Sequence, residues 1–169
     1  NLFQDGKKII GYREALVLPK LPKKMVVVGS GAIGSEFAYF YNAMGVEVTL
    51  IEFLPTIIPL EDEDVAKQLG RSFKKSGIKV MTNSSVESVD TKGANCKVLV
   101  KTKKGEETIE CDVVLSVVGI KRNIENIGLE EVGIATDRDI VITNDYYQTN
   151  IPGYYAIGDI VKGHALAHV

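Results

Sequence analysis

Residues 25–36 read Met-Val-Val-Val-Gly-Ser-Gly-Ala-Ile-Gly-Ser-Glu, and this stretch decides the fold. The short, β-branched apolar run at 25–28 is typical of a strand that is buried on both faces. Apolar residues then recur at helical spacing as far as Met44, and Gly45 ends the predicted helix. A second apolar run at 46–51 predicts another strand. A strand, a helix and a strand in such close succession predict a right-handed crossover between parallel strands.

The link between the first strand and the helix follows the pattern Gly-x-Gly-x-x-Gly, in which each glycine has a separate role. Gly29 permits a tight turn, Gly31 leaves space for a pyrophosphate, and Gly34 lets the helix pack close to the strand. The helix start adds unbonded N–H groups and a partial positive charge. We therefore predict a dinucleotide site at Gly29, Ser30, Gly31, Ala32, Ile33, Gly34, Ser35 and Glu36. A turn that uses glycine only for packing is the alternative.

Two acidic residues accompany this turn. Glu52 ends the second strand, where its carboxylate can accept hydrogen bonds from a ribose. No Lys or Arg occurs from Phe53 to Ala66, so a 2′-phosphate would meet only like charge, and the sequence favours NAD over NADP. Glu36 is expected in the first turn of the helix. It either approaches the dinucleotide or only stabilises the helix dipole, and both interpretations stay open.

The remaining pattern predicts a mixed α/β protein. A second helix is expected at 62–76, with Val65, Leu69 and Phe73 on its buried face. The other predicted elements are a third parallel strand at 78–81, an antiparallel meander formed by the runs 86–89, 97–102 and 108–118, and a last strand at 154–157. The predicted fold class is α/β: a Rossmann-like, doubly wound parallel sheet with an antiparallel β-meander. Residues 1–22 are predicted to be an irregular lead-in, and residues 23–140 the NAD-binding domain.

Composition narrows the function classes. Of the 169 residues, 45% are hydrophobic and 25% charged, which is typical of a globular chain. Twenty Lys and Arg balance 22 Asp and Glu, so no nucleic-acid partner is expected. No apolar run reaches the roughly 18 residues of a membrane helix, and no export signal is visible, so we expect a soluble, cytoplasmic protein without a membrane partner. The start at Asn1 suggests a fragment or a processed chain.

The cysteines and histidines predict no metal site. Cys96 and Cys111 fit neither a redox Cys-x-x-Cys spacing nor a zinc pattern, and the chain has only two His. Both cysteines lie in short apolar stretches that are expected to be strands. We expect two reduced, partly buried thiols.

Several motifs together resemble the flavoprotein disulfide reductases, and among them the dihydrolipoamide dehydrogenases. They are the glycine motif at 26–36, Ile-Glu-Asn-Ile-Gly-Leu-Glu-Glu-Val at 124–132, Tyr-Ala-Ile-Gly-Asp at 155–159 and Leu-Ala-His at 166–168. The resemblance covers residues 12–169. It implies an oxidoreductase that uses NAD and FAD.

The resemblance also implies roles for single residues. For NAD, it places residues 29–36 at the pyrophosphate, Glu36 near the nicotinamide, Glu52 at the adenosine ribose, and Val86 and Gly119 along the cofactor. For FAD, it places Asp159 at the ribityl chain and Ala165, Leu166, Ala167 and His168 against the flavin ring. Residues 141–169 would then complete the FAD-binding domain of the intact enzyme. That enzyme would be a homodimer that serves lipoyl-bearing 2-oxoacid dehydrogenase or glycine cleavage components.

This chain departs from the family pattern in two ways. Residues 119–123 read Gly-Ile-Lys-Arg-Asn where the family has Gly-Arg-x-Pro-Asn, so Ile120 and Arg122 replace the expected Arg and Pro. The redox cysteine pair and the His-Glu base of the family are absent, so no catalytic residue is predicted in this chain. An NADH oxidase or another NAD(P)H-flavin reductase is the nearest alternative, and a non-catalytic NAD-sensing regulatory domain is an alternative of another class.

Overall fold

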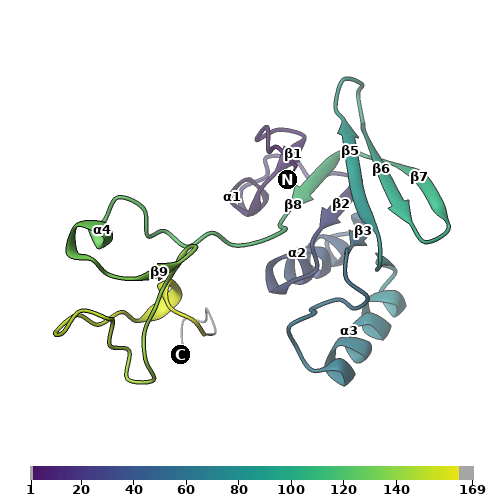
Figure 1. The fold of residues 1–169 in the computed structure, drawn as a ribbon. Helices are drawn as coiled ribbons and strands as arrows, with labels where there is room; N and C mark the ends of the chain where they lie inside the picture. Colours follow the sequence, from purple (N-terminus) through teal and green to yellow (C-terminus); the bar gives the residue numbers. More distant parts are fainter. Residues whose placement is uncertain (1, 164–169) are drawn as a thin grey trace. The chain divides into compact units, whose positions relative to one another are not determined.

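The computed structural model describes residues 2–163. The chain divides into two compact units, one ending at Gly119 and the other beginning at Ile120. The first unit holds most of the regular structure, whereas the second consists mainly of loops (Figure 1). Residues 120–140, which the sequence analysis joined to the NAD-binding domain, belong to the second unit.

A five-stranded parallel sheet forms the centre of the first unit. Its strands, in spatial order, are β1 (Ile9–Ile10), β8 (Val113–Ser116), β2 (Lys24–Val28), β3 (Glu47–Ile51) and β4 (Lys79–Met81). All four neighbouring pairs are parallel, which confirms the predicted orientation. Side chains alternate across the sheet: Met25 and Val27 of β2 pack into one hydrophobic cluster, and Val26 and Val28 pack into another.

Helices cover the first of these faces. α2 (Ala32–Ala43) and α3 (Glu63–Lys75) contribute Ala38, Tyr41 and Phe73 to the cluster with Met25 and Val27. Asp62 caps α3, because its Oδ1 accepts hydrogen bonds from the N–H groups of Asp64 at 2.9 Å and Val65 at 3.3 Å. The expected burial of Val65 is wrong. The buried face of α3 runs through Ala66, Leu69 and Phe73, and Val65 lies one position away from this line and is exposed.

A three-stranded antiparallel sheet covers the opposite face. It consists of β5 (Ser85–Asp90), β6 (Cys96–Thr102) and β7 (Gly105–Cys111), in that order (Figure 1). The predicted combination of a parallel sheet with an antiparallel meander is therefore confirmed. The expectation of one strand over 108–118 is wrong, because β7 ends at Cys111 and β8 belongs to the parallel sheet. The carboxylate of Asp112 fixes this crossing by accepting the N–H groups of Lys23 at 2.7 Å and Lys24 at 2.9 Å.

The N-terminal segment is more regular than predicted. Residues 9–10 form β1, which pairs with β8, and α1 (Tyr12–Leu16) follows directly. Ile10 and Ala15 lie in the same cluster as the buried residues of β2 and α2. The prediction of an irregular lead-in is thus wrong for residues 9–16. A strand of two residues is too short to show an alternating pattern, so only its pairing with β8 reveals it.

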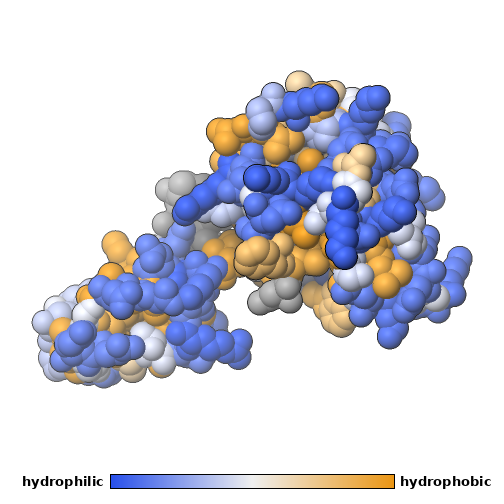
Figure 2. All heavy atoms as spheres, turned by 90° about the horizontal axis from the view of Figure 1, so that it is seen from above, coloured by the Kyte–Doolittle hydropathy of each residue, from blue (hydrophilic) through white to orange (hydrophobic). Residues whose placement is uncertain are grey.

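The second unit has a small core of its own. Val141, Ala156 and Val161 are buried, and Ile124, Leu129 and Ile134 pack against them. Its elements are α4 (Leu129–Val132), β9 (Thr136–Asp137), β10 (Ile140–Val141) and the 3-10 turn η1 (Gly158–Ile160). The predicted strand at 154–157 is wrong, since only Tyr155 pairs there, in a single bridge with Gln148. Apolar side chains remain exposed on both units, as the orange areas in Figure 2 show.

Within the described residues, no helix is both long enough and apolar enough to cross a membrane.

Candidate functional site

The glycine turn connects β2 to α2, and its three glycines have different surroundings. Gly29 has a φ of +100°, and a Cβ added there would lie 2.6 Å from the carbonyl oxygen of Val117. A Cβ at Gly34 would lie 1.9 Å from the carbonyl oxygen of Gly29. A Cβ at Gly31 would meet no heavy atom within 4 Å. Protein packing therefore explains the first and third glycines, but not the second.

Hydrogen bonds to neighbouring segments hold the turn in place. The N–H of Gly29 donates to the carbonyl of Ile51 at 2.9 Å, which ties the turn to the end of β3. The carbonyl of Ser30 accepts the N–H of Ile58 and the hydroxyl of Ser35, each at 2.9 Å. Ser30 is completely buried. The turn is therefore fixed by the fold before any ligand arrives.

No side chain of residues 2–163 caps the N-terminus of α2. Gly31 is the N-cap residue, and no acidic residue lies in the first turn. The first N–H groups of a helix have no intrahelical acceptor, and they carry the positive end of the helix dipole. This arrangement is suited to an anion such as a phosphate.

Glu36 lies beyond the first turn of α2, contrary to the sequence expectation. Its side chain is exposed, and it lines a cavity of about 220 Å³ together with Ala15, Leu16, Phe37 and Phe40. The helix dipole acts mainly on charges in the first turn. Stabilisation of the helix dipole is therefore a weaker explanation for Glu36 than it would be for an acidic residue in the first turn.

Glu52 is buried at the end of β3 and is bonded to the glycine turn, with only 8% of its surface exposed. Its Oε2 accepts the N–H of Ser30 at 2.9 Å and the hydroxyl of Ser30 at 2.6 Å. Its Oε1 accepts the N–H of Leu54 at 2.9 Å. A carboxylate can accept about four hydrogen bonds, so Oε1 has capacity for one more. Sequence reasoning missed this support of the turn, because the pairing of Glu52 with Ser30 exists only once β2 and β3 are aligned.

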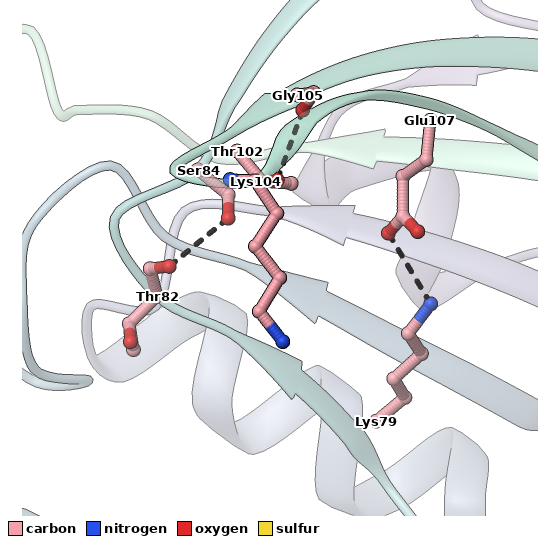
Figure 3. Close-up of polar contacts among 7 residues, drawn as sticks. All are labelled: Lys79, Thr82, Ser84, Thr102, Lys104, Gly105 and Glu107. Atoms are coloured by element: carbon pink, nitrogen blue, oxygen red, sulfur yellow. Dashed lines mark hydrogen bonds and ion pairs between the residues drawn. The ribbon is translucent and has the colours of Figure 1, made fainter.

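Val86 lies on the strand that leaves the Glu52 end of the sheet. The N–H of Ser84 donates to the carbonyl of Glu52 at 2.9 Å, so the start of β5 runs beside the end of β3. Figure 3 shows the polar contacts near this connection. The hydroxyl of Ser84 donates to the carbonyl of Thr82 at 3.0 Å, and Lys79 Nζ lies 3.4 Å from Glu107 Oε1. Further hydrogen bonds join Thr102, Lys104 and Gly105 within the β6–β7 turn. Val86 itself is half-buried and pairs with Val100 of β6.

Gly119 follows β8 at the same edge of the sheet. The N–H of Val117 donates to the carbonyl of Val28 at 2.9 Å, and the Val117 carbonyl faces Gly29. Gly119 is exposed, has a φ of +148° and would bring no added Cβ within 4 Å of another group. Residues 29–36, Glu52, Val86 and Gly119 thus all follow the carboxyl ends of parallel strands, where ligands of open α/β sheets bind.

The residues predicted for FAD lie in the second unit. Asp159 is exposed in η1, and its backbone carbonyl accepts a hydrogen bond from Arg122 Nε at 2.6 Å. Ala165, Leu166, Ala167 and His168 lie outside the described residues. Sequence reasoning recognised Arg122 only as a departure from the family pattern, and not as a partner of the Asp159 turn.

The two cysteines lie directly opposite each other on β6 and β7. Both thiols are free, and they are buried more completely than the partial burial that the sequence predicted. Burial raises the pKa of Cys96, and burial together with the neighbouring Cys96 raises the pKa of Cys111 to about 12. Among residues 2–163, no group of three His, Cys, Asp or Glu side chains lies close enough to hold a metal ion.

A parallel sheet whose strand leads through a glycine-rich turn into an uncapped helix defines the Rossmann-like class of folds. The sequence profile of a family described as pyridine nucleotide-disulphide oxidoreductase matches residues 2–169. The chain belongs to this family.

Individual relatives agree with this assignment. Dihydrolipoyl dehydrogenase of Rhizobium etli is 44% identical over 165 residues, which cover 97% of this chain and 34% of that protein. The enzyme of the same name from Mycobacterium leprae is 41% identical over 162 residues, covering 95% of this chain and 35% of its own length. The chain therefore spans about a third of the length of these curated relatives.

Solved structures share the fold. LpdA from Mycobacterium tuberculosis superposes with a TM-score of 0.85 and 34% identity, over 98% of this chain and 36% of that one. The HOCl-induced flavoprotein disulfide reductase RclA of Escherichia coli superposes with a TM-score of 0.83 at 23% identity, which is a likeness of fold alone. The predicted resemblance to dihydrolipoamide dehydrogenases is confirmed at the level of homology.

Proposed function

We propose that this chain is the NAD-binding portion of a dihydrolipoamide dehydrogenase-like flavoenzyme. The observation that carries the proposal is Gly31, beside which the described residues leave open space although the two neighbouring motif glycines are tightly packed. A pyrophosphate fits this space because it would meet backbone instead of a side chain, at the uncapped start of α2. When bound, NAD+ supplies the nicotinamide C4 that accepts a hydride from reduced FAD during dihydrolipoamide oxidation.

The chain's own residues would hold the adenosine half of NAD. Glu52 would accept a ribose hydroxyl on Oε1, while its other contacts keep the turn rigid. Val86 would lie against the adenine, and Gly119 would let the chain pass the cofactor closely. Glu36 would lie near the nicotinamide. A buried carboxylate at this place disfavours the 2′-phosphate of NADP.

The flavin side is proposed on the second unit. The carboxylate of Asp159 is exposed and makes no hydrogen bond within residues 2–163, so it is available to a ribityl hydroxyl. Ala165, Leu166, Ala167 and His168 would face the flavin ring. The whole enzyme would act as a homodimer on lipoyl-bearing 2-oxoacid dehydrogenase or glycine cleavage components. Because the family profile extends through the second unit, a non-catalytic NAD-sensing module is less well supported.

Calorimetric titration with NAD(H) and NADP(H) tests the cofactor proposal. We expect tighter binding of NAD(H). Glu52→Ala should weaken it by about 1.5–3 kcal/mol, which is roughly tenfold to hundredfold in affinity. Ser30→Ala is the matched control, since it removes one donor to Glu52 and keeps the carboxylate, so it should cost much less affinity. Equal or tighter NADP(H) binding, or an unchanged affinity in Glu52→Ala, would contradict the proposal.

A further inference from the structure

Arg122 joins three segments of the second unit that are distant in sequence. Its backbone N–H donates to Asp139 Oδ2 at 2.8 Å, and its Nη1 lies 3.8 Å from Asp139 Oδ1. Its Nε donates to the carbonyl oxygen of Asp159 at 2.6 Å. The side chains of Arg122 and Asp139 are only 22% and 26% exposed, so this pair is screened less by water than the other ion pairs among the described residues.

The turn that contains Asp159 has little support of its own. η1 is three residues long, it begins at Gly158 with a φ of +76°, and its closing hydrogen bond from Val161 to Gly158 measures 3.3 Å. The bond from Arg122 is shorter and comes from a charged donor, which makes it the stronger restraint. Because the acceptor is the backbone carbonyl, this bond does not occupy the Asp159 carboxylate, which can still meet a ligand.

The residue type matters at this position. A guanidinium presents donors in several fixed directions, so Nε and Nη1 can serve Asp159 and Asp139 together, whereas a lysine ammonium is a single point. Proline, which the family pattern places here, has neither the side-chain donors nor the N–H that bonds Asp139. A proline at position 122 could therefore make neither of the contacts that Arg122 makes with Asp139.

We infer that Arg122 is a positioning residue for the flavin side of the enzyme: it anchors the Gly158–Ile160 turn to the segment around Asp139 and thereby fixes the carboxylate of Asp159 for the ribityl chain. The inference rests on the proposed function, because only that function places FAD beside Asp159. The anchoring itself follows from the three contacts alone.

Hydrogen exchange and flavin affinity in the full-length enzyme test the two parts. The variants are Arg122→Ala and Arg122→Lys, and the control is Lys121→Ala, which removes the adjacent cation whose partner Glu125 lies in the same short segment. We expect faster exchange at residues 158–161 in Arg122→Ala, with unchanged exchange at residues 29–36, and FAD binding weaker by at least about tenfold. Arg122→Lys should show intermediate exchange rates and intermediate FAD affinity, because it keeps the positive charge but cannot contact Asp159 and Asp139 together. Lys121→Ala should match the wild type.

The remaining outcomes separate the two claims. Unchanged exchange and unchanged FAD affinity in Arg122→Ala would overturn the inference. Faster exchange at 158–161 with wild-type FAD affinity would overturn the positioning role. If Arg122→Ala does not fold, Arg122→Lys decides by the same two measurements. A wild-type enzyme that itself retains no FAD would overturn the proposed function, and the flavin role of Arg122 with it.

Discussion

At the scale of single residues, the three glycines of the turn have unequal meaning. Gly29 and Gly34 are required by the protein itself, because an added Cβ would overlap backbone atoms of Val117 or Gly29. Gly31 has a φ of −62° and open space around it, so neither strain nor packing excludes a side chain there. Because Gly31 has no side chain, space remains there for a bound ligand.

This difference gives a prediction with a built-in control. Gly31→Val should abolish NAD binding, a loss of at least about hundredfold, because its side chain fills the space proposed for the pyrophosphate. The free energy of unfolding should fall by no more than about 1 kcal/mol, the cost of a poor N-cap residue. Titration calorimetry and urea unfolding measure the two effects.

Gly34→Val is the matched comparison. Its Cβ would lie 1.9 Å from the Gly29 carbonyl oxygen, so this variant should lose stability as well as binding. If Gly31→Val bound NAD like the wild type, the turn would not cradle a phosphate.

Glu52 illustrates what residue-level sequence reasoning can and cannot reach. Its place after a buried strand was predictable from the apolar run that ends at Ile51. Its bonds to the N–H and hydroxyl of Ser30 were not, since they depend on the register between β2 and β3. Arg122 is similar, because its partners Asp139 and Asp159 follow it by 17 and 37 positions.

At the scale of elements, pattern length decided which predictions succeeded. β2, α2 and β3 follow one another closely, the two strands as apolar runs and the helix with apolar residues at helical spacing, so their type and order were predictable. β1 has two residues, and its partner β8 is about a hundred residues away in the sequence, so nothing local identifies it. The break between β7 and β8 falls within a continuous β-rich run, and only Asp112, bonded to the start of β2, marks it.

The turn before β1 gives a pH-dependent prediction. The Asp5 carboxylate accepts the N–H groups of Lys7, Lys8 and Ile9 at 2.8, 2.8 and 2.9 Å. Slight burial acts to raise the pKa of Asp5, but these bonds outweigh it and lower the pKa below the usual 3.8. A carboxylate whose pKa is lower in the folded than in the unfolded state adds stability at pH values above the unfolded-state pKa. This added stability is lost as the pH falls through the folded-state pKa.

Asp5→Asn should therefore be less stable than the wild type at pH 7, and the difference should vanish as the pH falls below 3.8. Urea unfolding of both proteins between pH 7 and pH 3 measures it. Asp90→Asn is the control, because Asp90 accepts one backbone N–H within residues 2–163, from Lys92 at 2.9 Å. A difference that grew towards low pH would contradict this account.

At the scale of the whole molecule, the second unit exposes much apolar surface for its small core. Tyr146, Tyr154, Tyr155 and Ile157 are between 48% and 79% exposed, whereas three residues form the buried centre in the described part of this unit, as far as residue 163. Hydrophobic residues also reach the surface of both units, as the orange areas of Figure 2 show. Surfaces like these favour association.

We therefore expect the purified 169-residue chain to self-associate with rising concentration and to be colourless. Asp159 and residues 165–168 are proposed to contact the ribityl chain and the flavin ring, but not the phosphates. FAD needs phosphate contacts to backbone N–H groups, so it should bind weakly. Sedimentation at two concentrations and absorbance in the flavin band measure both effects. Tyr155→Ser and Ile157→Ser together should reduce association. A yellow monomer with one FAD per chain would refute the proposed division of roles.

The facing thiols of β6 and β7 have a practical consequence. Cys96 and Cys111 are at most 2% exposed, and their pKa values are raised. At neutral pH both side chains are therefore protonated thiols, which react slowly, and a reagent in solution cannot reach them in the folded protein. We expect alkylation to require separation of the antiparallel sheet from the parallel one. The alkylation rate then measures how often that opening occurs. Intact mass measured over time should show both thiols labelled together and much more slowly than in urea. The Cys96→Ser variant should gain only one label. Rapid labelling of a single cysteine in the native protein would show that labelling follows a local movement and not the separation of the two sheets.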